Sequence, residues 1–297
     1  MSKLNTLLRP DYYDYFPLLT HEEVKARLHD LPVHLATFLE PQNLEISSKI
    51  TGRDERRSFL NTPLENQRRM LGEVLASVGV SPAAAGAVCA VRRERFAPPG
   101  ADDAAYFNVS IPIADGSCLS APGLVALMLD QIPQGCIDHV LEVGLGSGYH
   151  AACIAEYLGR SAVIFGYEAQ GEIGQLGRGN LLGEGYSVTL LDSLSETDTT
   201  GQYDLVYATF ANRSSRPLRQ FVREGGTLQV PRAISEREYL TENEDSWLRT
   251  EFSTFDDYVT GNWRNFLCIE TVRLIEGADR LLARLYDVTF VPDRLSS

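Results

Sequence analysis

The stretch Val140-Leu141-Glu142-Val143-Gly144-Leu145-Gly146-Ser147-Gly148-Tyr149-His150 decides the fold of this chain. An apolar run ends in an acid, three glycines follow at alternate positions, and an alanine-rich segment then continues as a predicted helix. Strand, tight turn and helix in this order are typical of a cradle for a nucleotide-like cofactor. Glycine is needed in the turn because the backbone takes angles that a Cβ disfavours, and because a ligand lies against bare main chain there.

The spacing of the glycines narrows the choice of cofactor. A dinucleotide fingerprint needs a glycine where this chain has Tyr149, and a phosphate loop needs a Gly-Lys-Ser/Thr ending that this stretch lacks. The acid before the first glycine, Glu142, fits S-adenosylmethionine better. Two further acids, Glu168 and Asp192, stand at the ends of the next two predicted strands, where open α/β sheets bind ligands. We therefore expect an adenosine-bearing cofactor; the alternative is a structural glycine turn with solvated acids.

Composition excludes several classes of protein. The net charge of −13 in 297 residues disfavours a nucleic-acid partner. Five scattered cysteines without a Cys-x-x-Cys pair argue against a disulfide framework and against a metal site such as zinc. No apolar run reaches membrane-spanning length, and the first residues do not form an export signal. We expect a cytoplasmic protein with no metal and no membrane partner, of unknown oligomeric state.

Predicted strands and helices alternate along most of the chain, which indicates an α/β fold. We expect a Rossmann-like sheet with helices on both faces, plus a mainly helical N-terminal extension. The extension is an accessory segment at residues 1–62, and the main domain spans residues 63–297, with a polar stretch at 232–262 that is a lid, an insertion or a flexible excursion. The predicted strands are 140–143, 162–167, 187–191, 203–209, 227–231, 266–274 and 286–291, and the predicted helices are 63–78, 82–90, 124–132, 151–158 and 218–222.

A second candidate site lies upstream of the glycine stretch, at Ser120. Proline at 122 marks a helix start, so the Ser120 hydroxyl is expected near free N–H groups at the end of a helix. Such a position attracts a carboxylate. The alternative is that Ser120 only caps the helix.

Five motifs occur in order along the chain: Arg93-x-x-Phe96-x-Pro98, Leu119-Ser120-Ala121-Pro122, Leu141 to Ala152, Gly225-Gly226 with Pro231, and Phe290-Val291-Pro292. Taken in this order, they resemble protein-L-isoaspartate O-methyltransferase over roughly residues 64 to 297. The resemblance implies an S-adenosylmethionine-dependent enzyme that methylates the carboxylate of isoaspartyl residues in a protein or peptide, after which the ester collapses through a succinimide.

The resemblance also implies roles for single residues. A carboxylate acceptor is already ionised at pH 7, so the transfer needs positioning and no general base. The implied roles are contacts to the methionine and ribose end of the cofactor for Glu142, Gly144, Gly146 and Gly148, to the ribose hydroxyls for Glu168, to the adenine for Asp192, and to the acceptor carboxylate for Ser120.

Three short stretches depart from the family pattern, mostly on the acceptor side: Ser117-Cys118, Leu191-Asp192-Ser193 and Thr209-Phe210-Ala211-Asn212. With the front extension and the 232–262 stretch, they count against general repair. Some relatives of the repair enzyme modify an aspartate of a dedicated, ribosomally made peptide, giving an aspartimide or isoaspartate, so a protein and such a peptide both stay open as acceptors. Two alternatives stay open, because a fold alone does not fix an acceptor. One is a small-molecule O- or N-methyltransferase; the other is a non-catalytic cofactor-binding protein.

Overall fold

A computed structural model gives the fold of the chain. Predictions for residues 1–60 and for residues 236–262 lie outside the part that it describes. The described residues are 61–77, 79–101, 105–108, 110–114, 117–133, 135–194, 201–209, 216–235, 265–274 and 280–288.

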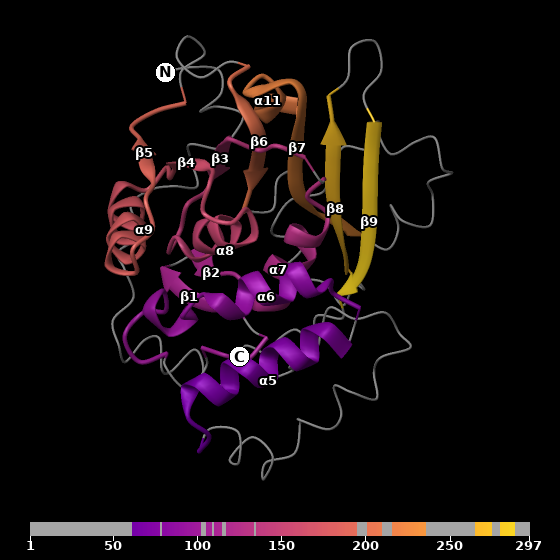
Figure 1. The fold of residues 1–297 in the computed structure, drawn as a ribbon. Coiled ribbons are helices and arrows are strands. Elements are labelled where there is room, and N and C mark those ends of the chain that lie inside the picture. The colour runs from indigo at the N-terminus through magenta and orange to yellow at the C-terminus, as the bar shows by residue number, and fades with distance from the viewer. Residues whose placement is uncertain are drawn as a thin grey trace, which may run out of the picture.

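Helices come first along the described chain, and strands alternate with helices after them (Figure 1). The helices are α5 (Leu64–Ser77), α6 (Pro82–Ala90), the short 3-10 helix η3 (Arg93–Arg95), α7 (Pro122–Asp130), α8 (Tyr149–Tyr157), α9 (Gly171–Gly183) and α11 (Arg216–Arg219). The strands are β1 (Ile111–Ala114), β2 (Ser117–Leu119), β3 (His139–Val143), β4 (Val163–Tyr167), β5 (Thr189–Leu191), β6 (Tyr203–Ala208), β7 (Val222–Ser235), β8 (Asn265–Arg273) and β9 (Arg280–Val288).

The large sheet has the strand order β5-β4-β3-β6-β7-β8-β9, and β1 and β2 form a separate hairpin. The first five strands of that order pair in parallel, whereas β8 and β9 add an antiparallel hairpin at one edge. The chain leaves β3 toward β4 and β5, then returns to the other side of β3 for β6. This reversal confirms the predicted Rossmann-like α/β fold, and the carboxyl ends of β3 and β6 are where open sheets of this kind bind ligands.

Alternate residues of the central strands belong to two hydrophobic cores, one on each face of the sheet. Val140 and Leu205 pack on one face with residues of α5 to α9, and Leu141 and Val206 pack on the other with Leu218 of α11. Strands buried on both faces read as continuous apolar runs, as β3 and β6 do. Helices therefore cover both faces in the described part of the chain, as predicted.

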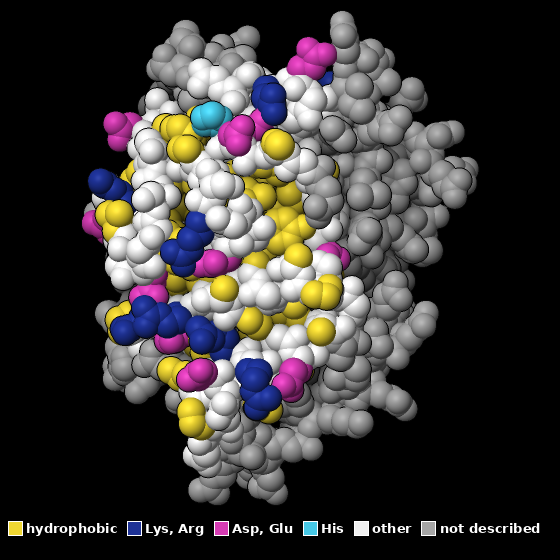
Figure 2. Space-filling view, viewed as in Figure 1, with side chains coloured by type: hydrophobic (Ala, Val, Ile, Leu, Met, Phe, Trp, Pro, Cys, Tyr) yellow, Lys and Arg dark blue, Asp and Glu magenta, His cyan; other side chains and the backbone are white. Residues whose placement is uncertain are grey.

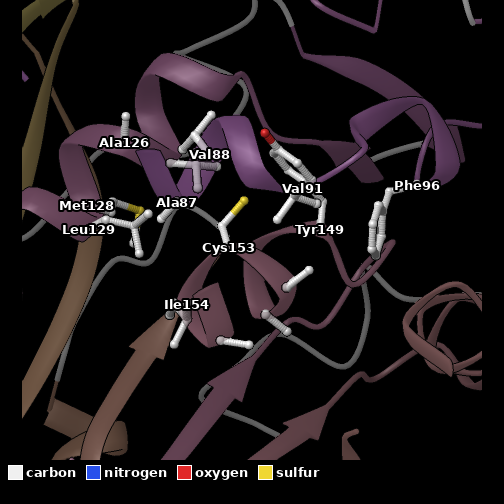
Figure 3. Close-up of a cluster of buried hydrophobic side chains, with 14 of the residues drawn as sticks. Ala87, Val88, Val91, Phe96, Ala126, Met128, Leu129, Tyr149, Cys153 and Ile154 are labelled. Atoms are coloured by element: carbon white, nitrogen blue, oxygen red, sulfur yellow. The ribbon is translucent and has the colours of Figure 1, made fainter. Parts of the chain in front are cut away.

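The helix after the glycine loop is the centre of the first core. Tyr149 and Cys153 of α8 point toward Val88 and Val91, at the end of α6, and Phe96 lies beside Tyr149 (Figure 3). The rings of Phe96 and Tyr149 lie 5.9 Å apart between centroids. The start of α8 is thus fixed by side chains from the segment 88–96, far from it in sequence.

The outer surface carries charges of both signs. Figure 2 shows apolar side chains toward the centre of one face, with Arg, Asp and Glu side chains around them. No block of a single charge dominates the described part of this face.

The predicted helix at 218–222 is wrong in its second half. The helix α11 ends at Arg219, and Val222 already belongs to β7, where it pairs with Tyr203. A β-branched residue beside a buried strand fits a pleated sheet better than a helix. Gly225 also lies within β7, where it has a left-handed φ of 74°.

Candidate functional site

The glycine loop between β3 and α8 has the backbone that its sequence predicts. Gly144, Gly146 and Gly148 have φ values of 90°, 55° and 84°. These are left-handed conformations that a side chain disfavours. Gly148 is the N-cap of α8, so the first turn of that helix directs its N–H groups toward the loop.

A glycine-rich helix supports this loop from behind. A Cβ on Gly177 of α9 would collide with the carbonyl oxygen of Gly146 and lie 3.2 Å from the amide nitrogen of Gly148. Asn180 of the same helix donates from Nδ2 to the carbonyl oxygen of Ser147 at 3.0 Å. Helix α9 is not predicted from the sequence, because glycines disfavour a helix and five occur within it. Four of these glycines occur at 171, 174, 177 and 179, two or three residues apart. This regular spacing was the signal in the sequence that another backbone segment packs closely against the helix.

Thr209 holds the loop from the side of β6. Its amide donates to the carbonyl oxygen of Val143 at 3.1 Å, and its hydroxyl donates to the carbonyl oxygen of Gly144. The loop is therefore fixed by contacts from both α9 and the end of β6.

Glu168 follows the last residue of β4 and reaches back to the loop. Its Oε2 accepts a hydrogen bond from the Gly146 amide at 3.0 Å, and its Oε1 accepts one from the Gln170 amide at 3.2 Å. Burial raises the pKa of this carboxyl, and the backbone hydrogen bonds oppose that rise. The carboxylate is thus oriented at the mouth of the loop before any ligand is present.

Glu142, the fourth residue of β3, is completely buried. Its register partner on β6 is Tyr207, and within the described chain neither carboxylate oxygen has a hydrogen-bond partner of normal geometry. Burial, and then the nearby Glu168, raise the pKa of Glu142 well above its usual value, while Tyr207 opposes the rise. A buried carboxylate without a partner is costly, so this site fits a ligand that brings a positive charge.

Asp192 directly follows β5 and is exposed. Because β3, β4 and β5 are parallel, the three acids Glu142, Glu168 and Asp192 lie at the same edge of the sheet, as predicted. Glu142 and Glu168 are close enough to influence each other's charge. Asp192 lies on the outermost strand, farther from the loop.

Ser120 lies at the start of α7, but it does not cap that helix. The N-cap is Ala121, whose carbonyl oxygen accepts the Val125 amide at 3.2 Å. The capping alternative is therefore wrong by one residue, because Pro122 occupies the first helical position and fixes the cap immediately before it. The Ser120 side chain is half-buried. In the first turn of α7, the Gly123 amide donates to Asn108 Oδ1 at 2.7 Å, so it is not free as the sequence predicts.

Arg93 belongs to one of the sequence motifs, but no role is predicted for it from the sequence. Its guanidinium is fully buried and donates to the carbonyl oxygens of Ala105 at 2.6 Å and Ser120 at 2.9 Å. It also lies over the ring of Tyr149, with the central carbon 5.4 Å from the ring centroid. Burial lowers the pKa of Arg93 to about 10. Arg93 thus joins the Ser120 turn to the first residue of α8.

Among the described residues, no group of three or more His, Cys, Asp and Glu side chains forms a metal site. In the same part of the chain, no helix combines the length and the apolar character needed to cross a membrane.

Comparisons with known proteins agree with this geometry. The family model for protein-L-isoaspartate(D-aspartate) O-methyltransferase matches residues 66–247. A protein-L-isoaspartate O-methyltransferase of Methanosarcina mazei is 29% identical over 205 residues, which cover 68% of this chain and 84% of the relative. One from Ignicoccus hospitalis is 35% identical over 149 residues, which cover 49% of this chain and 71% of the relative.

Two solved structures share the fold. A protein-L-isoaspartate O-methyltransferase structure aligns with a TM-score of 0.55 at 20% identity, covering 74% of this chain and 63% of that chain. A Plasmodium falciparum protein described as a protein-L-isoaspartate O-methyltransferase, in complex with S-adenosyl-L-homocysteine, aligns with a TM-score of 0.52 at 15% identity, covering 79% of this chain and 99% of that chain.

Proposed function

This chain belongs to the protein-L-isoaspartate(D-aspartate) O-methyltransferase family, and from that premise we propose that its acceptor is an aspartyl or isoaspartyl side chain of a dedicated, ribosomally made peptide. The chain is an S-adenosylmethionine-dependent protein carboxyl O-methyltransferase. The observation that carries the proposal is the placement of Ser120 at the start of α7, joined through Arg93 to the helix that follows the glycine loop.

The residues at the loop fit the cofactor. The left-handed glycines leave the backbone bare for a flat ligand, and the unpartnered Glu142 carboxylate offers a counter-charge to the cationic methionine portion. Glu168 would accept the ribose hydroxyls, and Asp192 would lie by the adenine. When bound, S-adenosylmethionine supplies a methyl group on a positively charged sulfur.

On the acceptor side, the chain has to bind and orient a carboxylate. Ser120 would donate a hydrogen bond to it, and the positive end of the nine-residue helix α7, whose Gly123 amide already donates to Asn108 Oδ1, adds a favourable dipole. The acceptor oxygen forms the new bond to the methyl carbon, and the sulfur keeps the electron pair of the broken bond. Positioning of this kind is worth roughly 7–11 kcal/mol when the reacting atoms are well aligned.

Two departures from the family pattern support a dedicated peptide over general repair. The segment before Ser120 is the short strand β2, and its sequence Ser117-Cys118 departs from the family pattern. Phe210-Ala211-Asn212 replace the alanine-rich run that follows Thr209 in the family, whereas Thr209 itself matches the family and holds the loop through Val143 and Gly144. Neither change lies in the glycine loop, Gly144 to Gly148. The backbone amide next to the methylated side chain would then attack the ester carbonyl and expel methanol, giving a succinimide.

The test incubates the full chain and methyl-labelled S-adenosylmethionine with three acceptors: an isoaspartyl peptide, its aspartyl twin, and the product of any precursor-peptide gene that neighbours this one. We expect a base-labile label, released as methanol, and a product that has lost one water, with the precursor peptide as the best acceptor. Equal labelling of any isoaspartyl peptide would instead support repair. A base-stable methyl group would indicate a small-molecule type of O- or N-methyltransferase, and cofactor binding without transfer to any acceptor would indicate a non-catalytic protein.

A further inference from the structure

A buried polar cluster lies beneath the glycine loop, formed by Glu142 of β3, Tyr207 of β6 and His150 of α8. Glu142 and Tyr207 are register partners on neighbouring strands, and both are completely buried. The rings of His150 and Tyr207 lie 4.9 Å apart between centroids, at an angle of 53°. Three polar side chains from three elements therefore meet in an otherwise apolar core.

Each member of this cluster has a polar atom left unpaired. Within the described residues, both Glu142 oxygens, the Tyr207 hydroxyl and His150 Nε2 make no hydrogen bond of normal geometry. Buried polar groups are nearly always paired in native proteins, so several unpaired groups in one place indicate an interaction that forms only with a ligand or a buried water.

The charged and titratable groups around Glu142 come from every neighbouring element. They are Tyr207 from β6, Glu168 at the end of β4 and Cys153 from α8, and His150 of α8 contacts Tyr207. None of these groups supplies a positive charge, because burial lowers the pKa of His150 to about 3 and leaves it neutral. The Tyr207 hydroxyl is the neighbour that favours the ionised form of Glu142.

We infer that Tyr207 is a positioning residue for the cofactor: when the cofactor is bound, its hydroxyl donates a hydrogen bond to Glu142 and holds that carboxylate ionised against the cationic methionine portion of S-adenosylmethionine. The inference rests on the cofactor placement in the proposed function. It predicts that cofactor binding releases a proton from Glu142 at pH values below the pKa of the free carboxyl. Binding therefore tightens as the pH rises and levels off above that pKa.

The test measures cofactor affinity by calorimetry from pH 5.5 to 8.5 for the wild type, Tyr207→Phe and Tyr203→Phe. Tyr203 is a matched control, because it is a buried tyrosine on the same strand that packs in the opposite core. We expect Tyr207→Phe to weaken binding about ten- to a hundredfold at pH 6.5, as for the loss of one hydrogen bond to a charged group, and to move the levelling point to higher pH. Tyr203→Phe should follow the wild-type profile.

A companion variant separates this inference from the cofactor placement. In Glu142→Gln, which cannot ionise, the pH dependence should disappear, and adding Tyr207→Phe to it should have little further effect. If Glu142→Gln binds as the wild type does at every pH, the cofactor placement is wrong. If Glu142→Gln loses the pH dependence but a folded Tyr207→Phe keeps the wild-type profile, only the role of Tyr207 is wrong.

A second measurement needs no variant. Carbon-13 NMR of the glutamate carboxyls in the wild type should show Glu142 titrating above its usual range in the free protein and ionised throughout in complex with S-adenosylmethionine. A carboxyl that stays protonated in the complex overturns the inference. Comparing S-adenosylmethionine with S-adenosylhomocysteine, which lacks the sulfonium charge but keeps the amino group, identifies which charge Glu142 meets.

Discussion

Replacing Gly177 with alanine tests whether helix α9 sets the shape of the cofactor loop. The matched control is Gly179→Ala, two residues along the same helix. A Cβ at Gly179 would meet no atom within 4 Å, whereas a Cβ at Gly177 would collide with the Gly146 carbonyl oxygen. Both variants gain helix propensity, by about 1 kcal/mol each. The propensity gain cancels in the comparison, so the difference between the two variants isolates the collision.

Overpacking of this kind costs about 1–3 kcal/mol. The atoms that the new methyl group meets belong to loop backbone, including the Gly148 amide at 3.2 Å, so part of this cost is relieved if the loop moves. We therefore expect Gly179→Ala to raise the melting temperature by about 2–4 °C and to bind cofactor normally. Gly177→Ala should lose that gain and should bind cofactor at least about tenfold more weakly, which corresponds to roughly 1.4 kcal/mol.

Thermal unfolding and calorimetric titration with S-adenosylhomocysteine measure the two quantities on the same samples. Equal melting temperatures and equal affinities for the two alanine variants would refute the reasoning, because they would show that α9 and the loop adjust independently.

Three other predictions concern single side chains of the site. Glu168→Ala should weaken cofactor binding by roughly 1.5–3 kcal/mol, the value of hydrogen bonds to a charged group, and unchanged affinity in a titration would remove Glu168 from the ribose. Ser120→Ala should slow methyl transfer about ten- to a hundredfold while cofactor affinity and melting temperature stay nearly the same, and a wild-type turnover rate would place the acceptor elsewhere. Burial lowers the pKa of His150 to about 3, so this side chain stays neutral in the folded protein. Below pH 6.5 the unfolded chain binds a proton that the folded chain does not, so the free energy of unfolding decreases as the pH is lowered. Chemical denaturation at pH 6.5 and pH 5 should show a loss for the wild type that exceeds the loss for His150→Gln by about 2 kcal/mol, and equal losses would contradict the assignment.

The parts of the fold predicted from the sequence are those that a short local pattern determines. The run from Val140 to His150 contains its own strand, turn and helix start, and the structure confirms all three. Glu168 and Asp192 were placed correctly at strand ends, because the end of an apolar run is visible in the sequence.

The parts that failed depend on contacts between distant segments. Helix α9 is rich in glycine because the cofactor loop packs against it, and that contact cannot be read from residues 171–183 alone. Residues near 222 were expected to continue a helix, but pairing with Tyr203 makes Val222 the start of a strand. Ser120 lies beside the start of α7, as predicted, but Ala121 is the residue that caps this helix. The two are neighbours in sequence, and only the backbone conformation shows which of them is the cap.

The buried Arg93 has a consequence for how the two halves of the site lose their structure. Its guanidinium holds the carbonyl oxygens of Ala105 and Ser120 while lying over the ring of Tyr149. Opening the first turn of α8 would remove one wall of the Arg93 pocket and expose the same side chain that fixes the Ser120 turn. The amides of residues near 120 and near 149 should therefore exchange with solvent as one cooperative unit, although almost thirty residues separate them. In a partly unfolded molecule, the glycine loop and the Ser120 turn would lose their structure together. A molecule with only one of these two segments folded would therefore be rare.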